Sequence, residues 1–491
     1  MGGRKTYNSW AIFFLICIPI FIGSVDLTSI VVVLPQATLD LLGVKGLYKG
    51  DLALWAVTAY LLAYTVSLAL VGRLSDTLSR KRVFFACVGI FVVGALWAGL
   101  AQSLPLTLLK ALPIWPDLDV LPLISLVIGR VIQAIGAGAS VSVGMALVAD
   151  IFPPDKRDRA ISLIGAIDSL GWVVGNLYAG LMLQILPSWR DLFLINAGVA
   201  FVALILVALA LRETPTQGGG EIYDGRGALL FGSALITLTV GIEALKDPST
   251  GAYVLLGASV VLLMAFLWRE RHTDNALFNL KFFELREVRV ALLTNLIVGF
   301  GLILMVAGVP LIINLRTVFL RGESLLTGAL RAGIMLSAMT VPLIVAVLVG
   351  ERRYRRVGAA IPVTFGLAVA LLGFVAASQW TYTTPNAGIA LPLALVGIGL
   401  GMTIGPLSLV VVDAAYPSER GLAVSLVLMM RLLGMTFGTP LAASLTLNLA
   451  NQWATERTAD MTTFHDIARS MLIPPMATDA LARVMLAGVV A

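Results

Sequence analysis

Four charged side chains lie inside long apolar stretches of this sequence, where charges are costly. They are Asp26, Arg130, Asp168 and Arg431. A charge at the centre of a bilayer costs about 2.5–3.5 kcal/mol on insertion scales, so each one needs a physical reason. The two acids and two bases can form static pairs that hold helices together, or they can carry protons and contact a substrate. Because buried ion pairs contribute little to stability, we favour the second interpretation.

Proton transfer is the chemistry that suits these residues. A protein that opens to one side of a membrane and then to the other changes the surroundings of a buried acid, so protonation can follow conformation. We expect Asp26 to be the titrating acid, with Arg130 and Arg431 as candidate counter-charges. Asp168 is expected to be a second proton carrier or a contact for a cationic substrate.

A charged segment, residues 72–82, separates two apolar runs and has the residue types of a moving contact. Gly72 allows two helices to approach closely, and Asp76 can accept a charge-assisted hydrogen bond from a base or a helix N-terminus. Three consecutive bases, Arg80, Lys81 and Arg82, follow. We expect these residues to gate the conformational change. The alternative is an ordinary positive loop that only sets topology.

The composition places these residues in a membrane protein. The chain is 59% hydrophobic and 13% charged, with a mean hydropathy of +0.95. Soluble domains carry roughly 25% charged residues. The apolar runs number about fourteen, each near the length that spans a bilayer. They predict spans near residues 9–35, 52–71, 83–102, 121–149, 159–186, 190–211, 226–245, 251–268, 289–314, 325–349, 357–378, 387–412 and 420–447, and a final run from residue 477.

The other features of the sequence exclude several function classes. Its pI of about 9.4 does not predict nucleic-acid binding, because the bases lie in short loops between apolar runs. Cys17 and Cys87 are the only cysteines and cannot form a disulfide framework. No phosphate-binding loop, metal-ligand spacing or nucleophile with a base is present, so we expect no cofactor, no metal and no enzyme activity. A channel would favour a symmetric oligomer with a filter, whereas this chain holds two unlike halves.

The loops indicate both the topology and an internal repeat. Lys and Arg are concentrated in alternate loops, which places those loops and the N-terminus in the cytoplasm. The segment 350–356 repeats the glycine, acid and base pattern of residues 72–82. We therefore expect two six-helix units, with an N-terminal bundle over 1–212 and a C-terminal bundle over 289–491. Between them, 213–288 would hold a glycine-rich linker, two inserted helices and an amphipathic cytoplasmic segment.

The last apolar run, residues 477–491, is too short to cross a bilayer. We expect that the sequence stops within a helix. The alternative is a short final helix shielded by its neighbours.

Several of these motifs resemble those of the major facilitator superfamily (MFS). Residues 72–82 resemble its loop between helices 2 and 3, G-x-L-[AS]-D-x-x-G-R-[KR]-[KR], with Ser79 in place of a glycine. Arg130 and Gln133 resemble its R-x-x-Q-G motif. The run 171–180 resembles the antiporter motif G-x-x-x-G-P-x-x-G-G, whose helix-packing glycines match Gly171, Gly175 and Gly180. Asn176 stands where that motif has proline.

Two further runs resemble fourteen-helix members of this superfamily. Asp26 with Leu34 and Pro35 is similar to the first-helix motif of fourteen-helix drug:proton antiporters. The run 397–408 together with Arg431 is similar to mycobacterial triacylglyceride exporters. Those exporters carry an acid in the fifth helix at the position of Ser169, one residue after Asp168.

The resemblance implies an all-α membrane protein with the MFS fold, two six-helix pseudo-repeats and two inserted central helices. It implies a monomeric, proton-coupled exporter in the inner membrane of a prokaryote. The expected substrates are lipophilic molecules such as triacylglycerides, with protons, membrane lipids and a periplasmic lipoprotein as further partners. The alternative is a multidrug:proton antiporter that exports cationic or amphipathic drugs. The sequence leaves open the choice of substrate, the acid that carries the proton and the lipoprotein.

Overall fold

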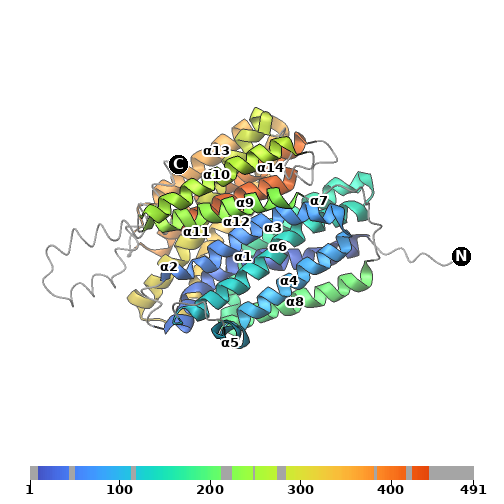
Figure 1. Cartoon of the computed structure of the whole chain (residues 1–491). Coiled ribbons are helices and arrows are strands. Elements are labelled where there is room, and N and C mark those ends of the chain that lie inside the picture. The colour runs from blue at the N-terminus through green and yellow to red at the C-terminus, as the bar shows by residue number, and fades with distance from the viewer. Residues whose placement is uncertain are drawn as a thin grey trace.

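The described part of the chain is built from helices, most of which cross the molecule from end to end (Figure 1). The computed structural model describes residues 9–43, 50–111, 118–211, 224–246, 249–273, 283–380, 384–415 and 423–441. Its labelled elements are α1 (Ser9–Leu42), α2 (Gly50–Ala53), α3 (Trp55–Thr77), α4 (Arg80–Gly99), α5 (Leu104–Lys110), α6 (Leu121–Ile151), α7 (Pro154–Ile185), α8 (Trp189–Ala210), α9 (Gly225–Glu243), η2 (Ala244–Lys246), α10 (Thr250–His272), α11 (Arg286–Arg321), α12 (Leu325–Val357), α13 (Ala360–Ala377) and α14 (Asn386–Asp413). A further helix, Ala423–Leu441, follows.

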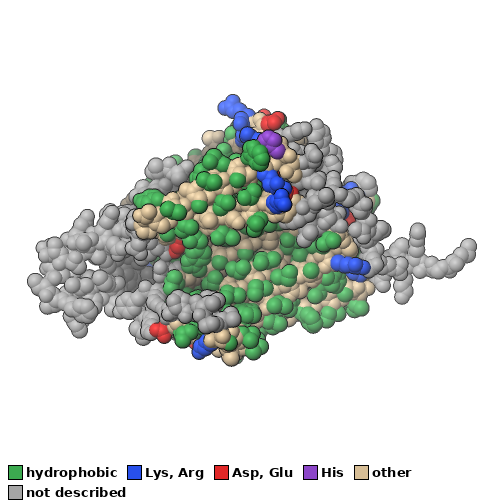
Figure 2. Space-filling model, viewed as in Figure 1, with side chains coloured by type: hydrophobic (Ala, Val, Ile, Leu, Met, Phe, Trp, Pro, Cys, Tyr) green, Lys and Arg blue, Asp and Glu red, His purple; other side chains and the backbone are tan. Residues whose placement is uncertain are grey.

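Twelve of the helices in the described ranges are long and apolar enough to cross a membrane, by length and composition. The apolar part of α3 is shorter, Trp55–Leu68. Figure 2 shows hydrophobic side chains over the middle of one face, with charged side chains near its margins. Such a surface suits lipid around the middle of the molecule and water at its two ends. The chain is therefore an all-α membrane protein. The fourteenth expected span, from residue 477, lies outside the described residues.

Helix packing divides the spans into two groups. In the first group, α1 packs on α7 and α8, while α6 packs on α3 and α4. In the second, α12 and α13 both pack on α14. Gly434 of the helix Ala423–Leu441 lies against the backbone of α11, where a larger residue would collide with Leu296. The hairpin of α9 and α10 contacts the first group through α3.

Glycines on α7 set its distance from two neighbouring helices. A Cβ at Gly171 or Gly175 would collide with α1, at Phe21 and Val25 respectively. A Cβ at Gly180 would lie 3.1 Å from the carbonyl oxygen of Ala329 on α12. The first two glycines therefore allow close packing inside the first group of helices, and the third allows it between the two groups.

The segment expected to be a loop, residues 72–82, is mostly helical. The helix α3 continues through Thr77 and α4 begins at Arg80, so Leu78 and Ser79 form the break. Gly72 and Asp76 therefore belong to the last two turns of α3. A helix satisfies its own backbone hydrogen bonds, and a single glycine does not end it, so α3 can extend beyond its apolar part. The side chains of residues 72–77 lie outside the described part of the structure.

Candidate functional site

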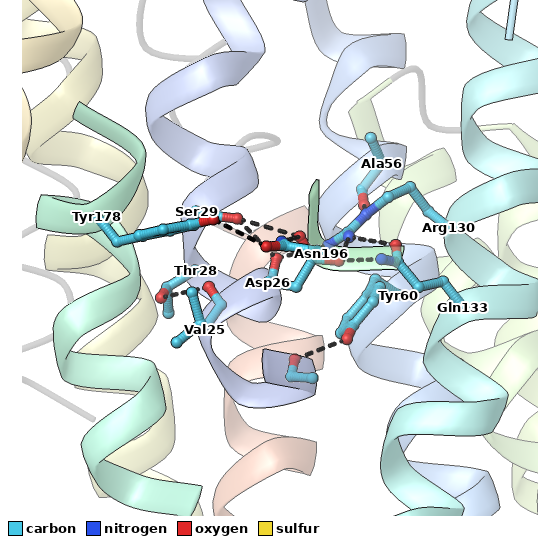
Figure 3. Close-up of polar contacts among 11 residues, drawn as sticks. Val25, Asp26, Thr28, Ser29, Ala56, Tyr60, Arg130, Gln133, Tyr178 and Asn196 are labelled. Atoms are coloured by element: carbon cyan, nitrogen blue, oxygen red, sulfur yellow. Dashed lines mark hydrogen bonds and ion pairs between the residues drawn. The ribbon is translucent and has the colours of Figure 1, made fainter. Parts of the chain in front are cut away.

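Asp26 and Arg130 form an ion pair in the middle of the first group of helices (Figure 3). The Arg130 Nη1 donates to Asp26 Oδ2 at 2.9 Å, and both side chains are fully buried. The Nη2 of Arg130 also donates to the backbone carbonyl of Asp26 at 3.0 Å. This pair joins α1 to α6, and the role of the two residues in proton coupling stays a prediction.

Side chains from three helices complete the shell around this pair. Gln133 donates to Asp26 Oδ2, and its own Oε1 accepts from Arg130 Nη1 at 2.7 Å. The Nδ2 of Asn196, on α8, donates to Asp26 Oδ1 at 3.1 Å. The Arg130 guanidinium lies 3.8 Å from the ring centroid of Tyr60, on α3. The two opposite charges thus compensate each other and are hydrogen-bonded in a fully buried site, as buried charges require.

Asp168 lies in a second cluster, on α7. Its Oδ1 accepts from Ser24 Oγ at 2.5 Å and from the Tyr64 hydroxyl at 3.0 Å. Tyr64 is one turn from Tyr60 on α3, with 6.0 Å between their ring centroids. Aromatic contacts therefore link the Asp168 cluster to the Asp26–Arg130 pair. Among the described residues, no base lies within ion-pair distance of Asp168.

Arg431 lies in the second group of helices and is 3% exposed. Its Nε donates to Asn295 Oδ1, on α11, at 3.1 Å. Its guanidinium carbon is 5.9 Å from the ring centroid of Trp172, on α7. Arg431 therefore faces Trp172 of α7, whereas Arg130 is the ion-pair partner of Asp26.

A cavity of about 610 Å³ separates the two groups of helices. Most of its lining is aliphatic, from α7, α11, α12, α14 and the helix Ala423–Leu441. Of the four intramembrane charges, Arg431 lines this cavity, whereas Asp26, Arg130 and Asp168 do not. Both acids point instead into the first group of helices, where their hydrogen-bond donors lie.

The cavity reaches one end of the molecule and is closed toward the other. Arg159, Glu351 and Arg355 line it near the ends of α7 and α12 that carry many bases. Toward the opposite end, α7 and α12 are in direct contact. There the Gln184 Nε2 donates to the carbonyl oxygen of Leu326 at 3.1 Å, and a Cβ at Gly333 would lie 2.7 Å from the carbonyl oxygen of Asn176. The cavity is thus accessible from the base-rich end of the molecule and blocked by helix contact at the other.

The expected gating residues are described in part. Arg80 Nη1 donates to Asp150 Oδ1, on α6, at 2.6 Å. Lys81 donates to the carbonyl oxygen of Leu211. Both contacts lie within the first group of helices and at the end of the molecule to which the cavity opens. The surroundings of Gly72 and the side chain of Asp76 lie outside the described part. Arg82 lies in the first turn of α4, and its gating role stays a prediction.

Four polar residues of these clusters were not singled out from the sequence: Tyr60, Tyr64, Ser24 and Asn295. The two tyrosines are four residues apart, so they share one face of α3. That spacing of polar aromatic residues in an apolar span was a usable signal. Ser24 and Asn295 gave no comparable signal, because single small polar residues are common in membrane helices. In the described ranges, no group of three His, Cys, Asp or Glu residues could hold a metal ion.

Comparison with known proteins identifies the family. The model named Major Facilitator Superfamily matches residues 16–439. The chain belongs to this superfamily. It is therefore a secondary transporter and not an enzyme. This confirms the expected class and the MFS fold; the assignment to its fourteen-helix branch stays a prediction.

The most similar curated relatives include transporters from mycobacteria. The triacylglyceride transporter of Mycolicibacterium smegmatis is 29% identical over 399 residues, which cover 78% of this chain and 66% of that protein. An uncharacterized MFS-type transporter of Mycobacterium tuberculosis is 29% identical over 409 residues, which cover 81% of this chain and 54% of that protein. The chain thus spans about half to two thirds of the length of these two relatives.

Solved structures of the same fold match nearly the whole chain. A bacterial homolog of the human lysosomal transporter Spinster, inward-facing and unoccupied, gives a TM-score of 0.61 at 16% identity and covers 99% of this chain and 95% of its own. The xylose transporter XylE from E. coli, partially occluded and inward open, gives a TM-score of 0.59 at 13% identity. The match covers 99% of this chain and 97% of XylE. At these identities the likeness shows the fold alone.

Proposed function

We propose that this transporter is a proton-coupled exporter of lipophilic substrates, with lipids such as triacylglycerides as its main substrates. The observation that carries the proposal is the cavity between the two groups of helices, which is mostly aliphatic. A lipid gains free energy by burying its acyl chains against such walls. The names of the mycobacterial relatives support the same substrate class.

The placement of the acids favours lipids over cationic drugs. A cavity that binds cations needs a carboxylate in its wall, where it can pair with the bound charge. Asp26 and Asp168 are turned away from the cavity. The acid in the described lining, Glu351, shares the open end with two bases, Arg159 and Arg355. Multidrug:proton antiport is the alternative, and Glu351 is the residue that would support it.

The intramembrane charges and the topology have the following roles in this transport cycle. Asp26 binds the proton, with Arg130 as its counter-charge, and Asp168 is the second candidate carrier. The base-rich end of the molecule faces the cytoplasm by the positive-inside rule, so the cavity is open inward. The chain has fourteen spans, with α9 and α10 as the inserted pair, and lies in the inner membrane. A lipoprotein partner outside the membrane remains a prediction.

Transport by proteoliposomes tests this function. Purified protein is reconstituted with a fluorescent triacylglyceride, and its transfer between leaflets is followed with a membrane-impermeant quencher under an imposed pH gradient. We expect transfer to accelerate with the gradient and to stop when an ionophore collapses it. Transfer that ignores the gradient would contradict proton coupling. Gradient-driven transport of ethidium with no transfer of the lipid would establish the drug antiporter instead.

A further inference from the structure

The closed end of the cavity contains buried polar groups that no group in the described part of the protein satisfies. Asn176 is 1% exposed, and neither its Nδ2 nor its Oδ1 has a hydrogen-bond partner among the described residues. Trp172 is 8% exposed, and its Nε1 is also without a partner. Both residues line the cavity. Leaving buried donors unpaired costs free energy, so their presence on a cavity wall calls for a partner that the protein does not supply.

These groups are held together on one face of α7. Trp172 and Asn176 are four residues apart, so their side chains are neighbours along the helix. The backbone around them is fixed by contacts on two sides. The Trp172 carbonyl accepts from Thr28 Oγ1 at 2.8 Å, and Gly333 of α12 packs on the Asn176 carbonyl. The two side chains are therefore positioned by the backbone and remain available to a ligand.

Arg431 adds donors to the same place from the other side of the cavity. Its guanidinium faces the Trp172 ring, and its one hydrogen bond to the described residues uses Nε, so the two Nη groups stay available. An indole N–H, an amide N–H₂ and a guanidinium all donate, and the Asn176 Oδ1 is the one acceptor among these three side chains. Such a set recognises an oxygen acceptor. The rest of the cavity lining is mostly aliphatic, which suits an uncharged ligand better than a fully anionic one.

We propose that Trp172, Asn176 and Arg431 form a polar subsite that binds the ester carbonyl oxygens of an uncharged acyl glyceride. This inference rests on the proposed function and specifies how the lipid is oriented. The ester groups lie at the closed end, and the acyl chains extend along the aliphatic walls toward the open end. The asparagine that replaces the proline of the antiporter motif thus supplies a ligand contact.

Binding of matched lipids to the purified protein in detergent micelles tests the subsite, with native mass spectrometry as the readout. The probes are dioleoylglycerol and its dioleyl ether analogue, which lacks only the carbonyl oxygens. We expect the wild-type protein to bind the diester about 5–10-fold more tightly, the effect of one or two hydrogen bonds. In Asn176→Leu and Trp172→Phe, the ratio should fall toward one while the affinity for the diether is kept.

Trp97→Phe is the matched control, because the Trp97 Nε1 already donates to the Ser125 carbonyl at 3.1 Å and does not line the cavity. It should leave the diester preference unchanged.

Equal wild-type affinity for diester and diether would overturn the subsite without requiring any variant to fold. Equal loss of both lipids in Asn176→Leu would reduce Asn176 to a packing role. Preferential binding of oleate over the diester would overturn the uncharged ligand class. Because this assay measures no transport, failure of the subsite is distinguishable from failure of the proposed function.

Discussion

The two buried acids have unlike surroundings, and this difference sets their expected roles. Asp26 has a buried ion-pair partner and three side-chain donors besides it. Asp168 accepts hydrogen bonds from two hydroxyl groups. Neutralising Asp26 leaves the Arg130 charge buried without a counter-ion, whereas neutralising Asp168 leaves no bonded base uncompensated. A stability measurement can therefore separate the structural role of each acid from its role in transport.

We expect Asp26→Asn to abolish gradient-driven transport and to lower the free energy of unfolding by about 3 kcal/mol. This is the lower end of the cost of breaking a buried ion pair, because the amide keeps some of the hydrogen bonds. Asp168→Asn should keep its hydroxyl contacts and unfold within a few degrees of the wild type. Thermal unfolding in detergent and transport by proteoliposomes provide the two readouts. The double variant Asp26→Asn with Arg130→Gln should regain stability and still lack coupling. If Asp168→Asn abolishes coupling while Asp26→Asn retains it, Asp168 is the proton carrier.

At the scale of the element, the junction of α3 and α4 is the expected gate. Asp76 lies in the last turn of α3, two residues before the break at Leu78 and Ser79. At this position an acid can interact with the positive end of α4. Arg80 and Lys81, at the start of α4, are already bonded within the first group of helices. The start of α4 is therefore anchored to the first group of helices, and a gate at this junction would have to contact the second group.

We expect Asp76→Ala to weaken closure of the base-rich end and to increase the population of the conformation described here. Spin labels at Leu78 and Val357, two exposed positions at that end, should report longer distances in the variant. Glu284→Ala removes an exposed acid just before α11 and should leave the distances unchanged. An identical distance distribution in Asp76→Ala would reduce the motif to a topology signal.

At the scale of the whole molecule, transport requires the two groups of helices to part where they now touch. The contact between α7 and α12 closes one end of the cavity, and it is made through small residues and backbone. Such a contact forms and breaks at low cost because few side chains must be rearranged. The apolar cavity on its other side supplies the space for a lipophilic substrate.

We expect Gly333→Val to disfavour closure at this end, because its Cβ would lie 2.7 Å from the carbonyl oxygen of Asn176. Overpacking of this kind costs about 1–3 kcal/mol, or roughly a 5–150-fold shift in population. Labels at Ile185 and Ile334 should move apart, and transport should slow by about tenfold or more. Gly257→Val is the control, since no atom lies within 4 Å of a Cβ built there. Unchanged distances in Gly333→Val would show that the ends separate by another route.

The sequence by itself determined the membrane class, the approximate spans and the four buried charges. These properties follow from rules that act along the chain: a bilayer has a set thickness, and it penalises every charge within it. The family followed from motifs at set spacing. The end of α3 was misplaced, because hydropathy marks where lipid ends and a helix can continue into water.

Only the tertiary structure decided how these residues are combined. Arg130 and Arg431 were equal candidates for Asp26, and the packing of α1 on α6 selected Arg130. The same packing turned both acids away from the cavity and left Asn176 unpaired on its wall. Which side of a helix faces a cavity depends on its rotation against distant helices. In a uniformly apolar span the local sequence carries little information about that rotation, so the partners could be resolved only in three dimensions.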